Sequence, residues 1–291
     1  VAGTAALTGC SPSKKEKNDV ASGDATKTTV VAGHERAGLP SFLVAPDPIT
    51  DIKKTLDFDV VVVGAGAAGV PAALAACEAG AHVALIQKEA TAISQGNTAS
   101  GIITDQSNPA AAAALGRLLV KESAYRADPE LINVWIENGG EAVKWVLDHV
   151  KEVGGSVIDQ GNNQQSKASN EVNGYSSLNY VTSYMGPKPY NNGEGMKVLA
   201  EVAAENGVEV FYNTPGEQLV KDGDKVTGVI AKGEEGYIQF NAAKGVIIAT
   251  GDYQNDEEMS NYYLPDLKYF GRKQSNKTGD GHKMIVWAGG K

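Results

Sequence analysis

A glycine motif between a predicted strand and a predicted helix constrains the fold of this chain more than any other feature. The motif, residues 64–69 (GAGAAG), follows an apolar run at 60–63 (VVVV) and precedes an alanine-rich segment at 70–77. In this context the first glycine permits a tight turn, the second lets a pyrophosphate approach the backbone, and the third lets the helix pack on the sheet. The sequence therefore predicts a dinucleotide site.

The residues around the motif support that interpretation. A second apolar run, 82–86 (HVALI), follows Gly80, where a helix C-terminus is expected. Pro71 fits in the first helical turn, where its missing N–H would have had no partner. An ordinary glycine-rich turn is the alternative, and the strand–turn–helix–strand order favours the dinucleotide site.

Composition excludes several other classes of protein. The chain has 291 residues, 42% of them hydrophobic, which is enough for one large or two ordinary globular domains. Its net charge of −9, without a basic cluster beside aromatic residues, argues against a nucleic-acid partner. With only Cys10 and Cys77, and no CxxC, CxxCH or HExxH motif, no metal site is predicted.

The N-terminal region resembles that of a bacterial lipoprotein. Residues 7–10 (LTGC) follow small apolar residues and resemble a lipobox, which predicts lipidation of Cys10, with residues 1–10 as the remnant of a signal peptide. Polar residues follow, so we predict a flexible tether over 11–50. A domain attached to the cell membrane outside the cytoplasm is the expected location. The alternative is a chance cysteine in a disordered tail.

The middle of the chain reads mostly as helix and loop. Alanines from Ala110 predict a helix through Tyr125, and Asp128 before Pro129 predicts the start of another helix. We expect its apolar faces to be interrupted at 139–140 (GG). Residues 159–192 are polar and poor in aliphatic side chains, which predicts a long irregular excursion.

The last third returns to alternating elements. The sequence predicts a helix at 194–206, a strand at 208–212, and a hairpin with arms at 225–231 and 237–242. A buried strand is expected at 245–251, ending on a glycine turn. Together these elements predict an α/β, Rossmann-like domain whose parallel central sheet carries an antiparallel β excursion.

Several ordered motifs resemble the FAD-dependent fumarate reductase and succinate dehydrogenase flavoprotein family. They are residues 64–69, 85–89 (LIQKE), 96–101 (GNTASG), 249–251 (ATG) and 278–281 (TGDG), and the resemblance runs from about residue 57 to the last residue. It implies a glutathione-reductase-type FAD-binding domain over 51–291, like the flavin domain of flavocytochrome c. It also implies that FAD is the cofactor and that both ends of the full protein are missing.

The end of the second strand departs from this pattern. A carboxylate is expected there to accept hydrogen bonds from the adenosine ribose, but the sequence has Gln87, which makes weaker bonds, and Glu89 lies two residues further on. Asp252 likewise stands where the family usually has a second glycine. The segment 214–219 is expected near the adenine, and Asp280 either caps the last helix or contacts the cofactor. The predicted cofactor contacts are Gly64, Ala65, Gly66, Ala68, Gly69, Gln87, Lys88, Asn97, Thr98, Ser100, Gly101, Glu217, Gln218, Ala249, Thr250, Gly251, Gly279 and Asp280.

The resemblance implies hydride transfer from FAD to a small unsaturated carboxylate, with electrons supplied by a partner redox protein. The family's arginines and histidines that hold this substrate lie downstream of the 278–281 motif, in a capping domain expected beyond Lys291. We therefore assign no catalytic residue here, and we interpret His282 as structural. Two alternatives remain open: a flavin dehydrogenase or oxidase acting on steroids or amino acids, and a surface lipoprotein that binds a nucleotide without catalysis.

Overall fold

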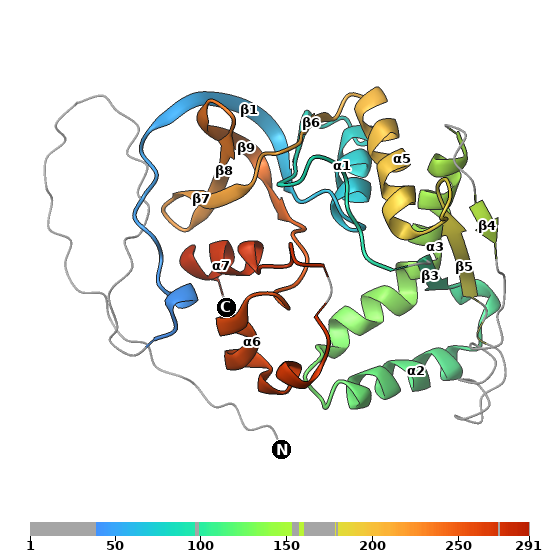
Figure 1. Ribbon diagram of the computed structural model, residues 1–291. Coiled ribbons are helices and arrows are strands. Elements are labelled where there is room, and N and C mark those ends of the chain that lie inside the picture. The colour runs from blue at the N-terminus through green and yellow to red at the C-terminus, as the bar shows by residue number, and fades with distance from the viewer. Residues whose placement is uncertain are drawn as a thin grey trace, which may run out of the picture.

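The computed structural model describes residues 39–96, 99–152, 157–159, 178, 180–272 and 274–290. A six-stranded sheet has the order β6-β2-β1-β9-β8-β7 (Figure 1). Its first four strands, β6 (Glu209–Phe211), β2 (Val83–Ile86), β1 (Ile52–Val63) and β9 (Gly236–Ile248), are parallel. The antiparallel strands β8 (Lys225–Gly233) and β7 (Gly216–Asp222) extend it. This confirms the parallel sheet with its antiparallel excursion.

Alternating side chains of β1 enter two cores. Val60 and Val62 face α1 (Gly69–Glu78) and α5 (Asn192–Glu205), which lie side by side in Figure 1. Val61 and Val63 face the opposite way, into a core that includes Met284 of α7 (Asp280–Trp287). A period of two is what a strand covered on both faces requires.

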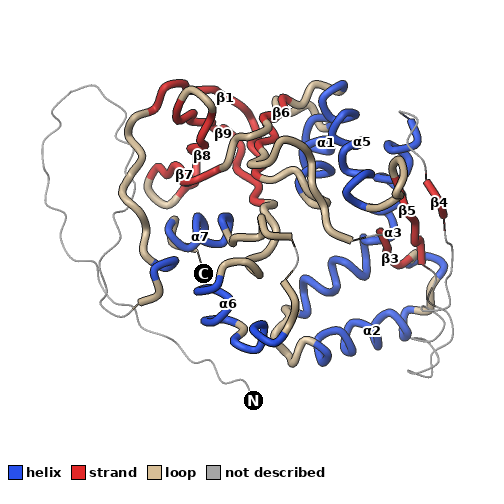
Figure 2. The backbone as a smooth tube through the Cα atoms, in the orientation of Figure 1, coloured by secondary structure: helices blue, strands red, loops and turns tan. Residues whose placement is uncertain are grey.

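A smaller sheet lies at the other end of the molecule. It has the order β3-β5-β4 and consists of β3 (Ala99–Ile102), β5 (Tyr180–Met185) and β4 (Val157–Asp159), all antiparallel. Two helices accompany it, α2 (Pro109–Glu122) and α3 (Pro129–Glu152) (Figure 2). The expectation that 159–192 is irregular throughout was wrong for 180–185, because β5 pairs there with strands distant in sequence.

Helix α3 continues through Gly139 and Gly140, the two positions at which the sequence predicted an interruption of its apolar faces. A Cβ atom on Gly101 of β3 would lie 2.2 Å from the Gly139 backbone, and one on Gly140 would lie 2.1 Å from the Ile102 carbonyl oxygen. The two glycines therefore let the helix backbone touch the strand backbone. This close packing compensates for the low helix propensity of glycine.

The remaining short elements are the 3-10 helices η1 (Ser41–Leu43), η2 (Thr104–Gln106) and η3 (Pro265–Tyr269), and helix α6 (Glu257–Tyr263). Residues 39–50 pack against the domain, with the Phe42 side chain only 4% exposed, so this part of the predicted tether is held in place. Residues 1–38, with Cys10, lie outside the described residues. The predicted strand at 245–251 is the end of β9, where Ile247 is 39% exposed and so not buried as expected.

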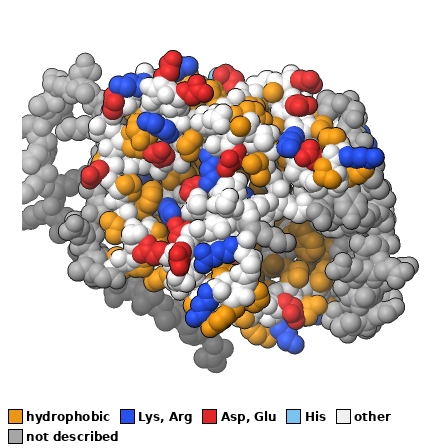
Figure 3. Space-filling view, in the orientation of Figure 1, with side chains coloured by type: hydrophobic (Ala, Val, Ile, Leu, Met, Phe, Trp, Pro, Cys, Tyr) orange, Lys and Arg blue, Asp and Glu red, His pale blue; other side chains and the backbone are white. Residues whose placement is uncertain are grey.

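Among the residues described, no helix is both long and apolar enough to cross a bilayer. Acidic and basic side chains are interspersed over the described part of the face in Figure 3, without a continuous basic surface.

Candidate cofactor site

The glycine turn brings together the ends of three parallel strands. Gly64, at φ +107°, donates its N–H to the Ile86 carbonyl of β2 at 2.8 Å. The Ala249 N–H donates to the Val63 carbonyl of β1, also at 2.8 Å. A Cβ atom on Gly64 would lie 2.5 Å from the Ala249 carbonyl oxygen, so only glycine permits this junction.

The next two glycines set the start of α1. A Cβ atom on Gly69 would lie 1.7 Å from the Gly64 carbonyl oxygen, so the helix begins directly on the turn. A Cβ atom on Gly66 would lie 3.2 Å from the Ile93 carbonyl oxygen. The N-cap residue, Ala68, supplies no side-chain acceptor to the first helical turn. Bare backbone at a helix N-terminus suits a pyrophosphate.

A cleft opens along this turn. It is lined by eight of the predicted contacts, by Pro215 and Gly216 of the segment 214–219 expected near the adenine, and by residues such as Ile93, Asn276 and Lys277 that were not among the predicted contacts. The position of Lys277 beside the 278–281 motif is the signal that would have found it. The eight predicted residues in the cleft are Gly64, Ala65, Gly66, Gln87, Lys88, Ala249, Thr250 and Asp280.

A second hollow adjoins the cleft on the other side of the turn. The two share Gly66, Ile93, Ala249, Thr250 and Lys277, and the second reaches the predicted contacts Ala68 and Gly251. Their shared wall makes one elongated site, which matches the extended shape of a dinucleotide lying across the carboxyl ends of the strands.

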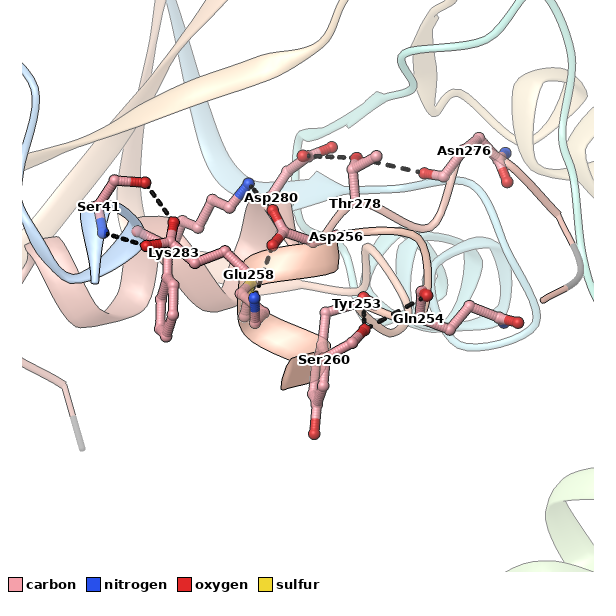
Figure 4. Close-up of polar contacts among 12 residues, drawn as sticks. Ser41, Tyr253, Gln254, Asp256, Glu258, Ser260, Asn276, Thr278, Asp280 and Lys283 are labelled. Atoms are coloured by element: carbon pink, nitrogen blue, oxygen red, sulfur yellow. Dashed lines mark hydrogen bonds and ion pairs between the residues drawn. The ribbon is translucent and has the colours of Figure 1, made fainter. Parts of the chain in front are cut away.

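A charged pair spans the cleft. The Lys88 ammonium, at the end of β2, lies 2.8 Å from Oδ2 of Asp280, at the start of α7, and donates a hydrogen bond to the Thr278 hydroxyl at 2.9 Å. The Thr278 hydroxyl donates in turn to Asp280 Oδ1 at 2.8 Å, a contact drawn in Figure 4. The site thus presents both a cation and a carboxylate.

Gln87 occupies the expected ribose position but is already engaged. Its side chain is 7% exposed, and its Nε2 donates to the Thr91 carbonyl at 3.2 Å. Its backbone N–H and carbonyl pair with Phe211 and with the Thr214 N–H. The carboxylate that lines this cleft is that of Asp280. The sequence had left open whether Asp280 caps the last helix or contacts the cofactor.

Other predicted contacts have different surroundings. Gln218 bonds to the backbone of Asp47 and Ile49, and Glu217 accepts a hydrogen bond from the Tyr237 hydroxyl at 3.2 Å, so neither side chain lines the cleft. Gly101 packs on α3, and its neighbour Ser100 lies on the same strand, away from both hollows. Asn97 and Thr98 lie outside the described residues.

Gly279 and Asp252 shape the loop before α7. Gly279, at φ +71°, lines neither hollow, and its N–H donates to the Asp252 carbonyl at 3.2 Å. The Asp252 carboxylate accepts the Gln254 N–H at 3.0 Å, so this departure from the family glycine caps a local turn. The Gly281 N–H donates to the Thr250 hydroxyl at 3.1 Å, which joins α7 to the end of β9.

Helices α6 and α7 are joined by a second ion pair. Asp256 caps α6 by accepting the Met259 N–H at 2.8 Å, and it lies 2.7 Å from the Lys283 ammonium of α7 (Figure 4). Burial raises the pKa of Asp256, but the hydrogen bonds from Lys283 and Met259 outweigh it and leave the pKa below the usual carboxyl range. The aspartate therefore stays ionised and fixes α7, which carries Asp280.

Comparisons with known proteins agree with this geometry. The chain is 27% identical, over 90% of its length, to a probable fumarate reductase of Shewanella frigidimarina, and 30% identical, over 79%, to a urocanate reductase of Eggerthella lenta. It spans only 48% and 38% of those two relatives. A 3-ketosteroid-delta4-(5alpha)-dehydrogenase structure from Rhodococcus jostii shares the fold, with a TM-score of 0.61 and 22% identity over 83% of this chain and 55% of that one.

A family model described as an FAD binding domain matches residues 59–291, which include all the residues that line the two hollows. Three features of the site fit FAD. A side chain would clash at Gly64 and Gly69 of the turn, so the backbone there is bare; the start of α1 has no side-chain cap; and Lys88 and Asp280 supply polar groups. The chain therefore belongs to the FAD-binding domain family, and FAD is its cofactor.

Proposed function

We propose that this chain is the FAD-binding part of a reductase that transfers hydride to a small unsaturated carboxylate. The observation that carries the proposal is the FAD cleft in a chain similar to both a fumarate reductase and a urocanate reductase. Fumarate and urocanate each have a carbon–carbon double bond conjugated to a carboxylate. Such a double bond takes up a hydride at one carbon and a proton at the other, and FAD would supply the hydride once an electron donor has reduced it.

The described residues act by binding and orienting the cofactor. The backbone at 64–69 and the N-terminus of α1 would hold the pyrophosphate, because the helix dipole and unshielded N–H groups there favour negative charge. Lys88 adds a positive charge at the same cleft, and the Asp280 oxygens, each of which accepts one hydrogen bond within the protein, keep lone pairs for a cofactor hydroxyl. None of these groups is assigned a proton-transfer step.

His282 is kept out of the catalytic roles. It is solvent-exposed at the start of α7 and contacts the Tyr253 ring edge to face, with centroids 5.3 Å apart. It borders the second hollow, but within the described part of the chain no hydrogen-bond partner orients it toward a reacting atom. We propose that the groups that bind the substrate belong to other parts of the protein.

The test is electron transfer by the full-length protein. Purified protein loaded with FAD is reduced with a viologen donor, and reoxidation of the donor is followed after adding fumarate or urocanate. Reoxidation with an unsaturated carboxylate supports the proposal. Reduction of an oxidised dye by a 3-oxosteroid, without reoxidation of the donor by either carboxylate, favours the dehydrogenase alternative, and a colourless protein that takes up no FAD would favour the non-catalytic alternative.

We further propose that the protein is lipid-anchored through Cys10 outside the cytoplasm and receives electrons from a partner redox protein. The lipobox-like residues 7–10 support the anchor. The test is expression with a complete signal peptide, followed by membrane fractionation and mass spectrometry of the N-terminus. Membrane association that persists unchanged in Cys10→Ala would refute the anchor.

A further inference from the structure

The N-terminal segment 39–50, here called the strap, precedes the family match at 59–291 and packs across several elements. We propose that the strap is a positioning element for the cofactor. It holds β7 and α7 at the spacing that the adenosine end of FAD requires, so that tight FAD retention depends on it. The proposal rests on the FAD assignment alone and is independent of the electron acceptor.

One end of the strap is fixed to α6 and α7 through Phe42. The Phe42 ring is 4% exposed, and its centroid lies 5.6 Å from the rings of both Tyr262 and Tyr263. The Trp287 indole N–H, at the end of α7, donates to the Phe42 carbonyl at 2.9 Å. Burial of an aromatic ring with a satisfied indole donor gives this end a specific attachment.

Ser41 adds a polar contact beside it. Its N–H donates to Glu258 Oε1 at 2.7 Å, and its hydroxyl donates to Glu258 Oε2, as Figure 4 shows. The hydroxyl and backbone hydrogen bonds from Ser41 lower the pKa of Glu258. This carboxylate stands in the first turn of α6, so the strap is tied to both helices.

The other end is fixed to β7 by a single buried side chain. Gln218 is 5% exposed; its Nε2 donates to the Asp47 carbonyl at 2.7 Å, and its Oε1 accepts the Ile49 N–H at 3.0 Å. The Gln218 carboxamide thus bonds both a carbonyl and an N–H group of the strap backbone. These bonds explain the position of Gln218 better than a direct cofactor contact does.

The strap lines a hollow that adjoins the cofactor cleft. Pro46, Asp47 and Ile49 form one wall of this hollow. β7 and α7 form the others, and the hollow and the cleft share Pro215, Gly216 and Asp280. Because the cleft also contains Gln87, at the expected ribose position, the strap lies at the adenosine end.

Release of the strap would free both sides of that end, Gly216 of β7 and Asp280 of α7. If FAD binds tightly only when the strap is in place, the apparent Kd rises in inverse proportion to the fraction of molecules with the strap attached. By reciprocity, bound FAD must hold the strap more firmly. A strap that only stabilises the fold would show neither effect.

The test compares full-chain variants by FAD titration and by hydrogen exchange. Phe42→Ala removes the anchoring ring, and Phe42→Leu keeps most of the apolar contact. Phe270→Ala is the matched control, because Phe270 is 68% exposed and outside the strap. Trp287→Phe removes only the indole donor, and it decides the question if Phe42→Ala does not fold.

We expect Phe42→Ala to raise the Kd for FAD about tenfold or more, and Trp287→Phe about three- to tenfold. Phe42→Leu should restore most of the affinity, and Phe270→Ala should bind as wild type does. FAD should slow exchange of the Ile49 N–H. Wild-type affinity in a folded Phe42→Ala or in Trp287→Phe, or Ile49 exchange that FAD leaves unchanged, would overturn the proposal, as would a wild-type protein that binds no FAD.

Discussion

Gly66→Ala is expected to weaken FAD binding while leaving the fold intact. The Gly66 backbone is in a conformation that alanine adopts, since it is absent from the positive-φ glycines of the described chain. A Cβ atom there would meet only the Ile93 carbonyl oxygen, at 3.2 Å, so a shift of a few tenths of an ångström accommodates it. The methyl group would, however, stand at the point where the pyrophosphate must approach the turn.

Two opposing effects keep the stability change small. Alanine reduces the conformational entropy of the unfolded chain, which stabilises the folded protein by about 0.4–1 kcal/mol. The tight contact with Ile93 offsets that stabilisation. We therefore expect the free energy of unfolding to stay within about 1 kcal/mol of wild type. Loss of one charge-assisted hydrogen bond to the pyrophosphate costs about 1.5–3 kcal/mol, which raises the Kd about 10- to 100-fold.

The assay combines FAD titration, followed by quenching of flavin fluorescence, with urea unfolding of the apoprotein. Gly271→Ala is the matched control, because no atom lies within 4 Å of its added Cβ and its φ is not positive. Gly69→Ala marks the opposite extreme, since its Cβ would lie 1.7 Å from the Gly64 carbonyl oxygen and prevent folding. Wild-type FAD affinity in Gly66→Ala would refute the pyrophosphate placement.

Three further predictions concern the site and its supports. Gln87→Glu gives the expected ribose position a charged acceptor but removes the Nε2 donor to the Thr91 carbonyl, so FAD titration should show at most about tenfold tighter binding, and weaker binding would contradict this role. Folding depresses the pKa of Asp256, so the stability that its pair with Lys283 contributes is present above pH 3.8 and is lost as the pH falls through the lower pKa of the folded state. Asp256→Asn should therefore lower the free energy of unfolding at neutral pH by about 1 kcal/mol. In urea titrations the variant should also show a flatter dependence of stability on acid pH. Gly101→Ala should cost about 3 kcal/mol in urea unfolding through contact with Gly139, and a neutral effect would show that α3 can move away.

Elements with local signals could be predicted from the sequence. The turn at 64–69 has its three glycines within six consecutive residues, and Asp128 marks the start of α3 by a side-chain cap that the structure contains. The loop between β8 and β9 likewise lies within the predicted hairpin. In each case a few consecutive residues determine the conformation.

Elements that depend on distant partners could not be predicted in the same way. β5 is defined by pairing with β3, about eighty residues earlier in the chain, and the contact of Gly139 and Gly140 with β3 likewise has no signal in the residues around the two glycines. In the site, Gln218 was assigned to the cofactor because of its place in the chain, whereas its side chain binds the strap. Its partners at 47–49 follow no local pattern that would reveal this contact.

The length of β9 has a consequence for how sequences of this kind can vary. β1 pairs with β9 from Tyr237 to Ile248. This stretch of β9 contains both the hairpin arm and the segment that ends at the cofactor turn. Lengthening the loop at 234–235 would therefore leave that turn where it is. A residue inserted within the paired stretch would reverse which face each later side chain occupies. Natural insertions should thus gather at the loop, or at the register shift opposite 58–60, where the ladder already accommodates an irregularity.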